Sequence, residues 1–411
     1  MDLIYQFVDI DKLKQYHFLL ELVIILAAVK LAGHMSKRIG QPSVFGELLI
    51  GIVLGPAILG WIHVDPQHPG LIKELAEVGV ILLMFLAGLE TDVDEFKKTA
   101  YASSLVAVGG VIFPLIAGFA IGLVFGYDYS TAIFIGTLLV ATSVSISVQT
   151  LRELGKLQSK EGVTILGAAV LDDVLGIIIL SVVIGFTAGG GGGSVIDIVI
   201  LLAKIILFFI LTVFIGRKIL PRFFNWVSNL MTTEVLLTFG IIIALAFAYF
   251  AELFGLAGIV GSYFAGLMLS VTRYRHELFE KVEVVSFSFF VPIFFVSIGV
   301  TADVSGLKPD IILFLVVLTL VAILTKIFGG GLGARMAGFN WNSSAGIGAG
   351  MIARGEVGLI VASIGLTRNL IDKELFTITV IIVLATTLVT PPLLKLIFNP
   401  KKKRTRPSDI G

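Results

Sequence analysis

Apolar residues in this chain fall into blocks of about 20 residues, separated by short polar or Gly/Pro-containing stretches. A helix of about 20 residues is long enough to cross a hydrocarbon core of about 30 Å. The pattern therefore predicts an all-α polytopic membrane protein with thirteen transmembrane helices. The least distinct boundary lies across Leu253–Gly258, between the eighth segment and the ninth. The segments are centred on residues 17–34, 45–62, 72–89, 99–126, 130–149, 162–187, 195–216, 233–252, 256–272, 284–301, 310–334, 345–366 and 373–398.

Composition agrees with this class. The 411 residues are 57% hydrophobic and 14% charged, with a mean hydropathy of +1.02, whereas a soluble domain is about 25% charged. The chain has no cysteine, which excludes disulfides, thiol catalysis and thiolate metal sites. The first apolar block begins near His17 and lacks a small-residue cleavage site, so we interpret it as a retained helix and not as a signal peptide.

The distribution of basic residues predicts the orientation. If the N-terminus lies outside, nineteen of the 30 Lys and Arg residues fall in inner loops and six in outer segments, as the positive-inside rule requires. The C-terminus is then cytoplasmic, and residues 399–411 form a short basic tail suited to anionic lipid. We treat 1–411 as a single transmembrane domain, in which Gly189–Gly193 is a flexible outer linker.

Five ionisable residues are expected deep in the membrane, where charge is costly and is functional by default. They are Asp172, Asp173, Lys326, Arg354 and Glu356. Adjacent helical residues point about 100° apart, so Asp172 and Asp173 cannot make the same contacts. One carboxylate is expected to exchange ions and protons while a buried cation holds the other. Lys326 is the best candidate for that cation.

Two of the segments are interrupted by small and polar residues. The fifth becomes polar from Thr142 to Gln149, and the twelfth contains a glycine-rich stretch from Gly346 to Gly358. Such residues also serve close helix packing, as in the GxxxG at Gly51–Gly55, but this alternative is weak for both segments in register. The two segments are an odd number of spans apart and run in opposite directions. The pattern predicts an inverted repeat with two crossing discontinuous helices, in which repeat one covers about 17–187, a connector helix about 195–216 and repeat two about 233–398.

The expected chemistry follows from these residues. Na⁺ and K⁺ prefer hard oxygen ligands, and Asp173 with Thr142 and Ser143 supplies such a set. A carboxylate that binds either a proton or a cation, but not both, is enough to exchange one for the other. Arg354 and Glu356 are expected to neutralise the half-helix ends that the break exposes.

Six stretches carry a resemblance to a known family. In this order and combination the chain resembles the bacterial monovalent cation:proton antiporter-2 family, which includes NapA-type Na⁺/H⁺ antiporters and the Kef potassium efflux systems. The stretches are Gln41–Pro56 (QPSVFGELLIGIVLGP), Phe85–Glu90 (FLAGLE), Thr142–Val144, Leu171–Val174 (LDDV), Pro292–Gly299 (PIFFVSIG) and Ala353–Gly358 (ARGEVG).

The resemblance implies a 13-helix fold, a homodimer, and core and dimerisation domains that move in an elevator-like way in a bacterial or archaeal cytoplasmic membrane. It implies that Asp173 is the main ion-binding carboxylate, and that Asp172 also belongs to the ion- and proton-binding site and is paired with Lys326 until the ion or proton arrives. Thr142, Ser143 and Glu356 would line the site. The two-aspartate form is associated with electrogenic exchange. Kef-type members carry a nucleotide-binding domain, which we do not expect here because the sequence stops about a dozen residues after the last helix.

The predicted function is therefore exchange of Na⁺, or Li⁺, for protons in pH homeostasis, with no cofactor and no nucleic-acid partner. A K⁺/H⁺ antiporter or a Kef-type K⁺ efflux transporter stays open, because the ligand types are identical. A gated channel would need a continuous pore. An intramembrane aspartyl protease would need carboxylates from different helices facing one another, so we do not expect an enzyme.

Overall fold

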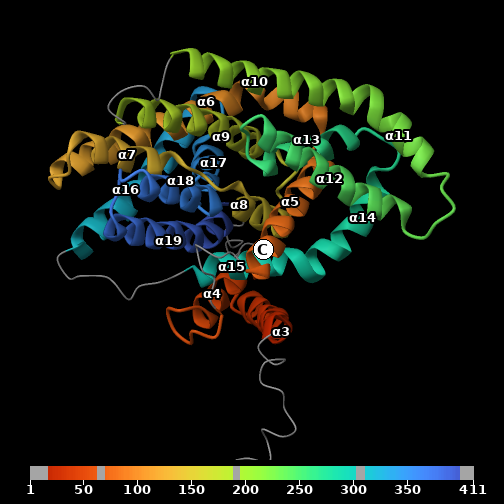
Figure 1. Cartoon of the computed structure of the whole chain (residues 1–411), viewed down its shortest axis with the longest axis horizontal. Coiled ribbons are helices and arrows are strands. Elements are labelled where there is room, and N and C mark those ends of the chain that lie inside the picture. Colours follow the sequence, from red (N-terminus) through yellow and green to blue (C-terminus); the bar gives the residue numbers. More distant parts are fainter. Residues whose placement is uncertain (1–16, 63–69, 188–194, 302–310, 399–411) are drawn as a thin grey trace, which may run out of the picture.

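The computed structural model describes residues 17–62, 70–187, 195–301 and 311–398, and every regular element in these ranges is helical (Figure 1). The Gly189–Gly193 linker and the basic tail lie outside the described residues. The elements are α3 (His17–Arg38), α4 (Ser43–Leu54), α5 (Leu71–Glu90), α6 (Val93–Val124), α7 (Tyr129–Val140), α8 (Val144–Glu153), α9 (Lys160–Thr187), α10 (Val195–Phe214), the π-helix η1 (Ile215–Ile219), α11 (Leu220–Val227), α12 (Val235–Leu253), α13 (Gly258–Leu269), α14 (Arg275–Val285), the π-helix η2 (Ser286–Phe290), α15 (Val291–Val300), α16 (Ile312–Met336), α17 (Trp341–Gly350), α18 (Glu356–Thr367) and α19 (Lys373–Phe398).

Within the described residues, nine helical stretches are long and apolar enough to cross a membrane. The shorter α4 and α13 have 12 residues each, about 18 Å at 1.5 Å per residue. The count of thirteen spans therefore stays a prediction. The boundary between the eighth and ninth segments is present, because α12 ends at Leu253 and α13 begins at Gly258.

Both predicted helix interruptions are present. The fifth segment consists of α7 and α8, separated by residues 141–143, and the twelfth consists of α17 and α18, separated by residues 351–355. The side chain of Asp128 accepts from two backbone N–H groups at the start of α7, and that of Asn340 accepts from one in α17. Each half-helix pair therefore begins at a polar cap.

One group of helices is built around α6 and α16. These two helices approach most closely at Gly109 and Gly329, where a Cβ atom on either glycine would overlap the carbonyl oxygen of the other. α6 also packs against α7 and α9, and α16 against α17 and α19. The absence of a side chain at both positions allows the two backbones to come into contact.

A second group contains two comparable pairs, α4 with α15 and α5 with α13. A Cβ atom at Gly51 or Gly299 would overlap backbone of the opposite helix in the first pair, and one at Gly88 or Gly266 would do so in the second. α3 packs on α4 as α12 packs on α13. The same pairing scheme thus occurs twice, and each of the α4–α15 and α5–α13 pairs joins one helix from the first half of the chain to one from the second.

Candidate functional site

The centre of the site is an ion pair between two helices. Lys326 on α16 places its Nζ 3.2 Å from Oδ1 and 3.4 Å from Oδ2 of Asp172 on α9. The two side chains are 0% and 1% exposed. Gly110 of α6 lies beside them, since a Cβ atom built there would be 3.7 Å from the Lys326 Nζ and 3.8 Å from the Asp172 Oδ1. The pair therefore lies where α6, α9 and α16 meet.

The two aspartates differ in their surroundings, as their helical positions predicted. Asp172 is 2% exposed, whereas Asp173 is only partly buried. The Asp173 carboxylate is nevertheless close enough to act electrostatically on the Lys326 ammonium. Asp172 is thus held inside the protein, and the adjacent carboxylate lies nearer the accessible surface.

The two helix interruptions meet in space. The backbone N–H of Ser143 donates to the carbonyl oxygen of Ala353 over 2.7 Å. The Ser147 hydroxyl donates to the carbonyl oxygen of Gly350 over 2.6 Å. Gly355 has no room for a side chain, because a Cβ atom there would be 2.8 Å from the Ser143 Oγ. The interruptions of the fifth and twelfth segments therefore form one connected structure.

Arg354 binds the carbonyl oxygens near the end of α7. Its guanidinium donates to Leu139 over 2.7 Å, to Ala322 over 3.1 Å and to Ile352 over 3.2 Å, and the residue is 1% exposed. The last carbonyls of a helix have no partner within the helix and carry partial negative charge. Arg354 therefore places its guanidinium against this end of α7, and its predicted role in charge compensation stays a prediction. Glu356 is the first residue of α18, where an acidic residue suits the helix dipole.

The two predicted hydroxyl ligands are both buried. Thr142 is 3% exposed and Ser143 is fully buried. The Thr142 hydroxyl donates to the carbonyl oxygen of Val140 over 3.3 Å, and its side chain also interacts with the Asp172 carboxylate. The structure thus brings Thr142 together with Asp172, whereas its proposed role with Asp173 stays a prediction.

Sequence reasoning missed a polar cluster at the end of α8. Arg152 lies 2.7 Å from Glu283 of α14 and 3.6 Å from Glu90 of α5, and its guanidinium stacks on the rings of Phe279 and Phe287. Arg152 is one of the nineteen basic residues counted above in inner loops, whereas the structure places it in α8. A signal was available, because Glu90 ends the FLAGLE stretch and its charge follows the uninterrupted uncharged run 78–89.

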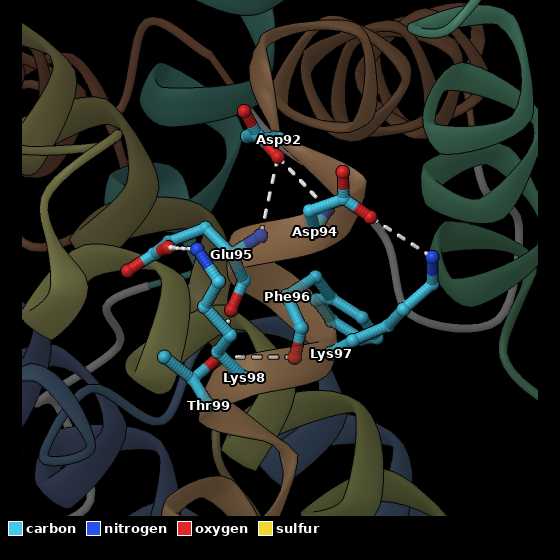
Figure 2. A network of polar contacts seen from close by, with 7 residues as sticks. All are labelled: Asp92, Asp94, Glu95, Phe96, Lys97, Lys98 and Thr99. Carbon is cyan, nitrogen blue, oxygen red and sulfur yellow. Dashed lines mark hydrogen bonds and ion pairs between the residues drawn. The ribbon is translucent and has the colours of Figure 1, made fainter.

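Figure 2 shows how α6, the helix beside the ion pair, begins. The Asp92 carboxylate accepts from the backbone N–H groups of Asp94 and Glu95 over 2.8 and 3.1 Å. These hydrogen bonds hold the pKa of Asp92 below its usual range. Lys97 pairs with Asp94, and Lys98 pairs with Glu95. This charged turn sets where the apolar part of α6 starts.

Comparisons with known proteins agree with this geometry. The chain is 46% identical over 394 residues to the Na⁺/H⁺-K⁺ antiporter GerN of Bacillus cereus, covering 96% of this chain and 100% of GerN. It is 50% identical to the probable Na⁺/H⁺ antiporter GerT of the same organism, covering 93% and 99%. The sodium proton antiporter MjNhaP1 of Methanocaldococcus jannaschii has the same fold, with a TM-score of 0.72 at 15% identity over 95% of this chain and 99% of that one. Residues 23–399 match the family described as sodium/hydrogen exchanger, transmembrane, and the chain belongs to this family.

Proposed function

We propose that this chain exchanges a monovalent cation, Na⁺ first and Li⁺ with it, for protons by alternating access at Asp173. The observation that carries this proposal is the meeting of both helix interruptions beside the Asp172–Lys326 ion pair. Ions bind at discontinuous helices in transporters of inverted-repeat architecture. The family and its named relatives support cation/proton antiport.

In the proposed cycle Asp173 binds either the cation or a proton. Thr142, Ser143 and backbone carbonyls beside the break add oxygen ligands of the kind that Na⁺ prefers. Lys326 balances the charge of Asp172, so that the change of charge during the cycle occurs at Asp173. Arg354 holds the end of α7 in place while the ion enters and leaves. Because two aspartates lie together, we expect the exchange to be electrogenic.

The proposed architecture is an inverted repeat of thirteen helices, with the interrupted helices crossing near the membrane midplane. Its support is the pairing scheme that occurs twice, together with the reciprocal contact of Gly109 and Gly329, which an axis relating the repeats would produce. The helices α6–α9 and α16–α19 would form the moving core domain. The helices α3–α5 and α10–α15 would form the dimerisation domain.

We place the protein in a bacterial cytoplasmic membrane as a homodimer, with the N-terminus outside and the C-terminus inside. The charge asymmetry of the loops supports this orientation. On this placement the end of α8 that carries Arg152 and Glu153 faces the cytoplasm.

Exchange of K⁺ is the second candidate. The specific observation in its favour is that GerN, identical at 46% of aligned positions, is named as an antiporter of both Na⁺ and K⁺. Oxygen ligands alone do not separate the two ions, because their preferred atoms are the same.

The test is proton flux in proteoliposomes challenged with Na⁺, Li⁺ or K⁺, for the wild type and Asp173→Asn. We expect cation-driven proton movement that is lost in the variant. The matched control is Asp94→Asn, which removes one carboxylate from the exposed turn of Figure 2 and is expected to keep full exchange. Exchange that persists in Asp173→Asn would contradict the site, and cation current without proton movement would favour a channel.

A further inference from the structure

The last residue of α8 is bound to the first residue of α4. Glu153 accepts a hydrogen bond of 2.7 Å from the backbone N–H of Ser43 on its Oε2, and a second from the Ser43 hydroxyl on its Oε1. The carboxylate thus caps the N-terminus of α4, where backbone N–H groups lack partners. In the proposed architecture α8 belongs to the core domain and α4 to the dimerisation domain, so this contact connects the two.

A second carboxylate faces the first. Glu47, one turn along α4 from Ser43, interacts with the Ser43 side chain and lies close enough to Glu153 for their charges to repel. A Cβ atom built on Gly33 would lie 3.4 Å from Ser43 Cβ and 3.6 Å from Glu47 Oε1, so these two side chains occupy the same location. The cations that act on Glu47 are Lys30 and Lys37 of α3. The Lys30 ammonium donates to the carbonyl oxygen of Phe287 over 3.0 Å, so this N–H group is not available to Glu47. Glu47 and Glu153 therefore lie together, and among the described residues neither forms an ion pair with Lys30 or Lys37.

An independent feature at this location points to a missing ligand. Gln149 of α8 is 7% exposed and donates from Nε2 to Glu153 Oε1 over 3.1 Å. Its carbonyl oxygen, on the same amide group, is buried and has no hydrogen-bond partner. A buried acceptor without a partner costs about 1–3 kcal/mol. Because the amide nitrogen beside this oxygen is hydrogen-bonded to Glu153, the oxygen lies within reach of the same carboxylate, and a group that satisfies both must carry positive charge or a proton.

We infer that Glu47, Glu153, Gln149 and Ser43 form a second binding site for an alkali-metal cation, separate from Asp173, which joins α4 to α8. The set offers carboxylate, amide and hydroxyl oxygens, which are hard ligands suited to Na⁺. Lys30 and Lys37 offset part of the charge of the two carboxylates, which favours a singly charged ion over a divalent ion. A cation bound here ties together the two groups of helices, so it slows their relative motion; this consequence rests on the proposed function.

The test is thermal unfolding of the purified full-length protein in NaCl against choline chloride of equal ionic strength. A ligand that binds only the folded state raises the melting temperature. In Asp173→Asn we expect a sodium-dependent rise to remain. Adding Glu47→Gln should move the midpoint of the sodium titration at least tenfold higher. Adding Gln149→Leu instead gives a second variant, with the same expectation, if the first does not fold.

The matched control is Asp173→Asn with Glu161→Gln. Glu161 is the second residue of α9 and accepts from the Ser343 hydroxyl over 2.7 Å, a partner outside the proposed site. This control should keep the sodium response of Asp173→Asn. The inference is overturned if Asp173→Asn shows no response to sodium, or if Glu47→Gln leaves the response unchanged. A rise produced by micromolar Ca²⁺ would overturn the assignment to an alkali cation.

The two proposals fail in different ways. If Asp173→Asn keeps exchange but Glu47→Gln removes the sodium response, the transport site is misassigned and the second site stands. If Asp173→Asn abolishes both exchange and the sodium response, the transport site stands and the second site does not exist.

Discussion

Lys326 Nζ lies 3.2 Å from Asp172 Oδ1, and neither side chain is more than 1% exposed. Burying an isolated charge at this depth costs free energy, and the attraction between Lys326 and Asp172 offsets part of that cost for both. Arg354 is also close enough to act on the Asp172 carboxylate. The charge of Asp172 is therefore matched by basic groups of the protein itself, which supports the proposal that Asp173 exchanges the external ions.

This pairing predicts a characteristic pattern of stability. In Lys326→Met the Asp172 carboxylate stays buried without its partner, and we expect a loss of about 3–5 kcal/mol in the free energy of unfolding. Adding Asp172→Asn removes the unpaired charge and should recover most of this loss. The measurement is chemical unfolding of both variants in detergent. Equal stability of the single and double variants would show that the pair is not coupled.

Arg354 carries a second prediction. Its guanidinium binds the Leu139 carbonyl oxygen at the end of α7, which would otherwise have no partner, and also binds the Ala322 carbonyl oxygen within α16. An unsatisfied buried acceptor costs about 1–3 kcal/mol. We expect Arg354→Met to lower the exchange rate per transporter at least tenfold. Arg354→Lys should retain part of it, because an ammonium reaches fewer of the oxygens. Proton flux in proteoliposomes is the measurement, and Arg368→Met, at an exposed helix end, is the control.

The helix interruptions and the buried pair were predictable because the residue types of a short segment are enough to indicate each of them. Polar residues from Thr142 and glycines before Glu356 indicated the breaks, and depth in an apolar helix identified Asp172 and Lys326. The partner of Thr142 was not predictable. Ala141, just before it, leaves the helical conformation with backbone angles of −50° and 131°, and the direction of a side chain after such a break cannot be inferred from the periodicity of the sequence.

Contacts between distant helix ends were also beyond the sequence. Ser43 and Glu153 are 110 residues apart, and periodicity shows which face of a helix is buried without showing which helix covers it. The close approach of α6 and α16 was not predictable for the same reason. The chain contains 45 glycines, and only the structure shows that Gly109 contacts Gly329.

That contact gives a third prediction. In Gly329→Ala the added methyl group would overlap the backbone of α6, so the helices must separate. Because the Asp172–Lys326 pair lies beside the crossing, we expect a lower melting temperature and a lower exchange rate. Gly176→Ala is the control, since its methyl group would meet only Val140, at 4.0 Å. If both alanine variants behave alike, the close approach of α6 and α16 is not required.

Asp92 carries a prediction about pH. The hydrogen bonds at the start of α6 lower its pKa from the ordinary value of 3.8. Stabilisation by a lowered carboxyl pKa is fully present above pH 3.8 and is lost as the pH falls through the folded-state value. We expect Asp92→Ala to melt below the wild type at pH 7, with a difference that shrinks below pH 3.8. Melting temperatures of both proteins between pH 7 and about pH 2.5 are the measurement, since the shift acts below the ordinary pKa. Because other carboxylates titrate equally in both proteins, the difference isolates Asp92, and a difference that stays constant to the lowest pH would contradict the role of its charge.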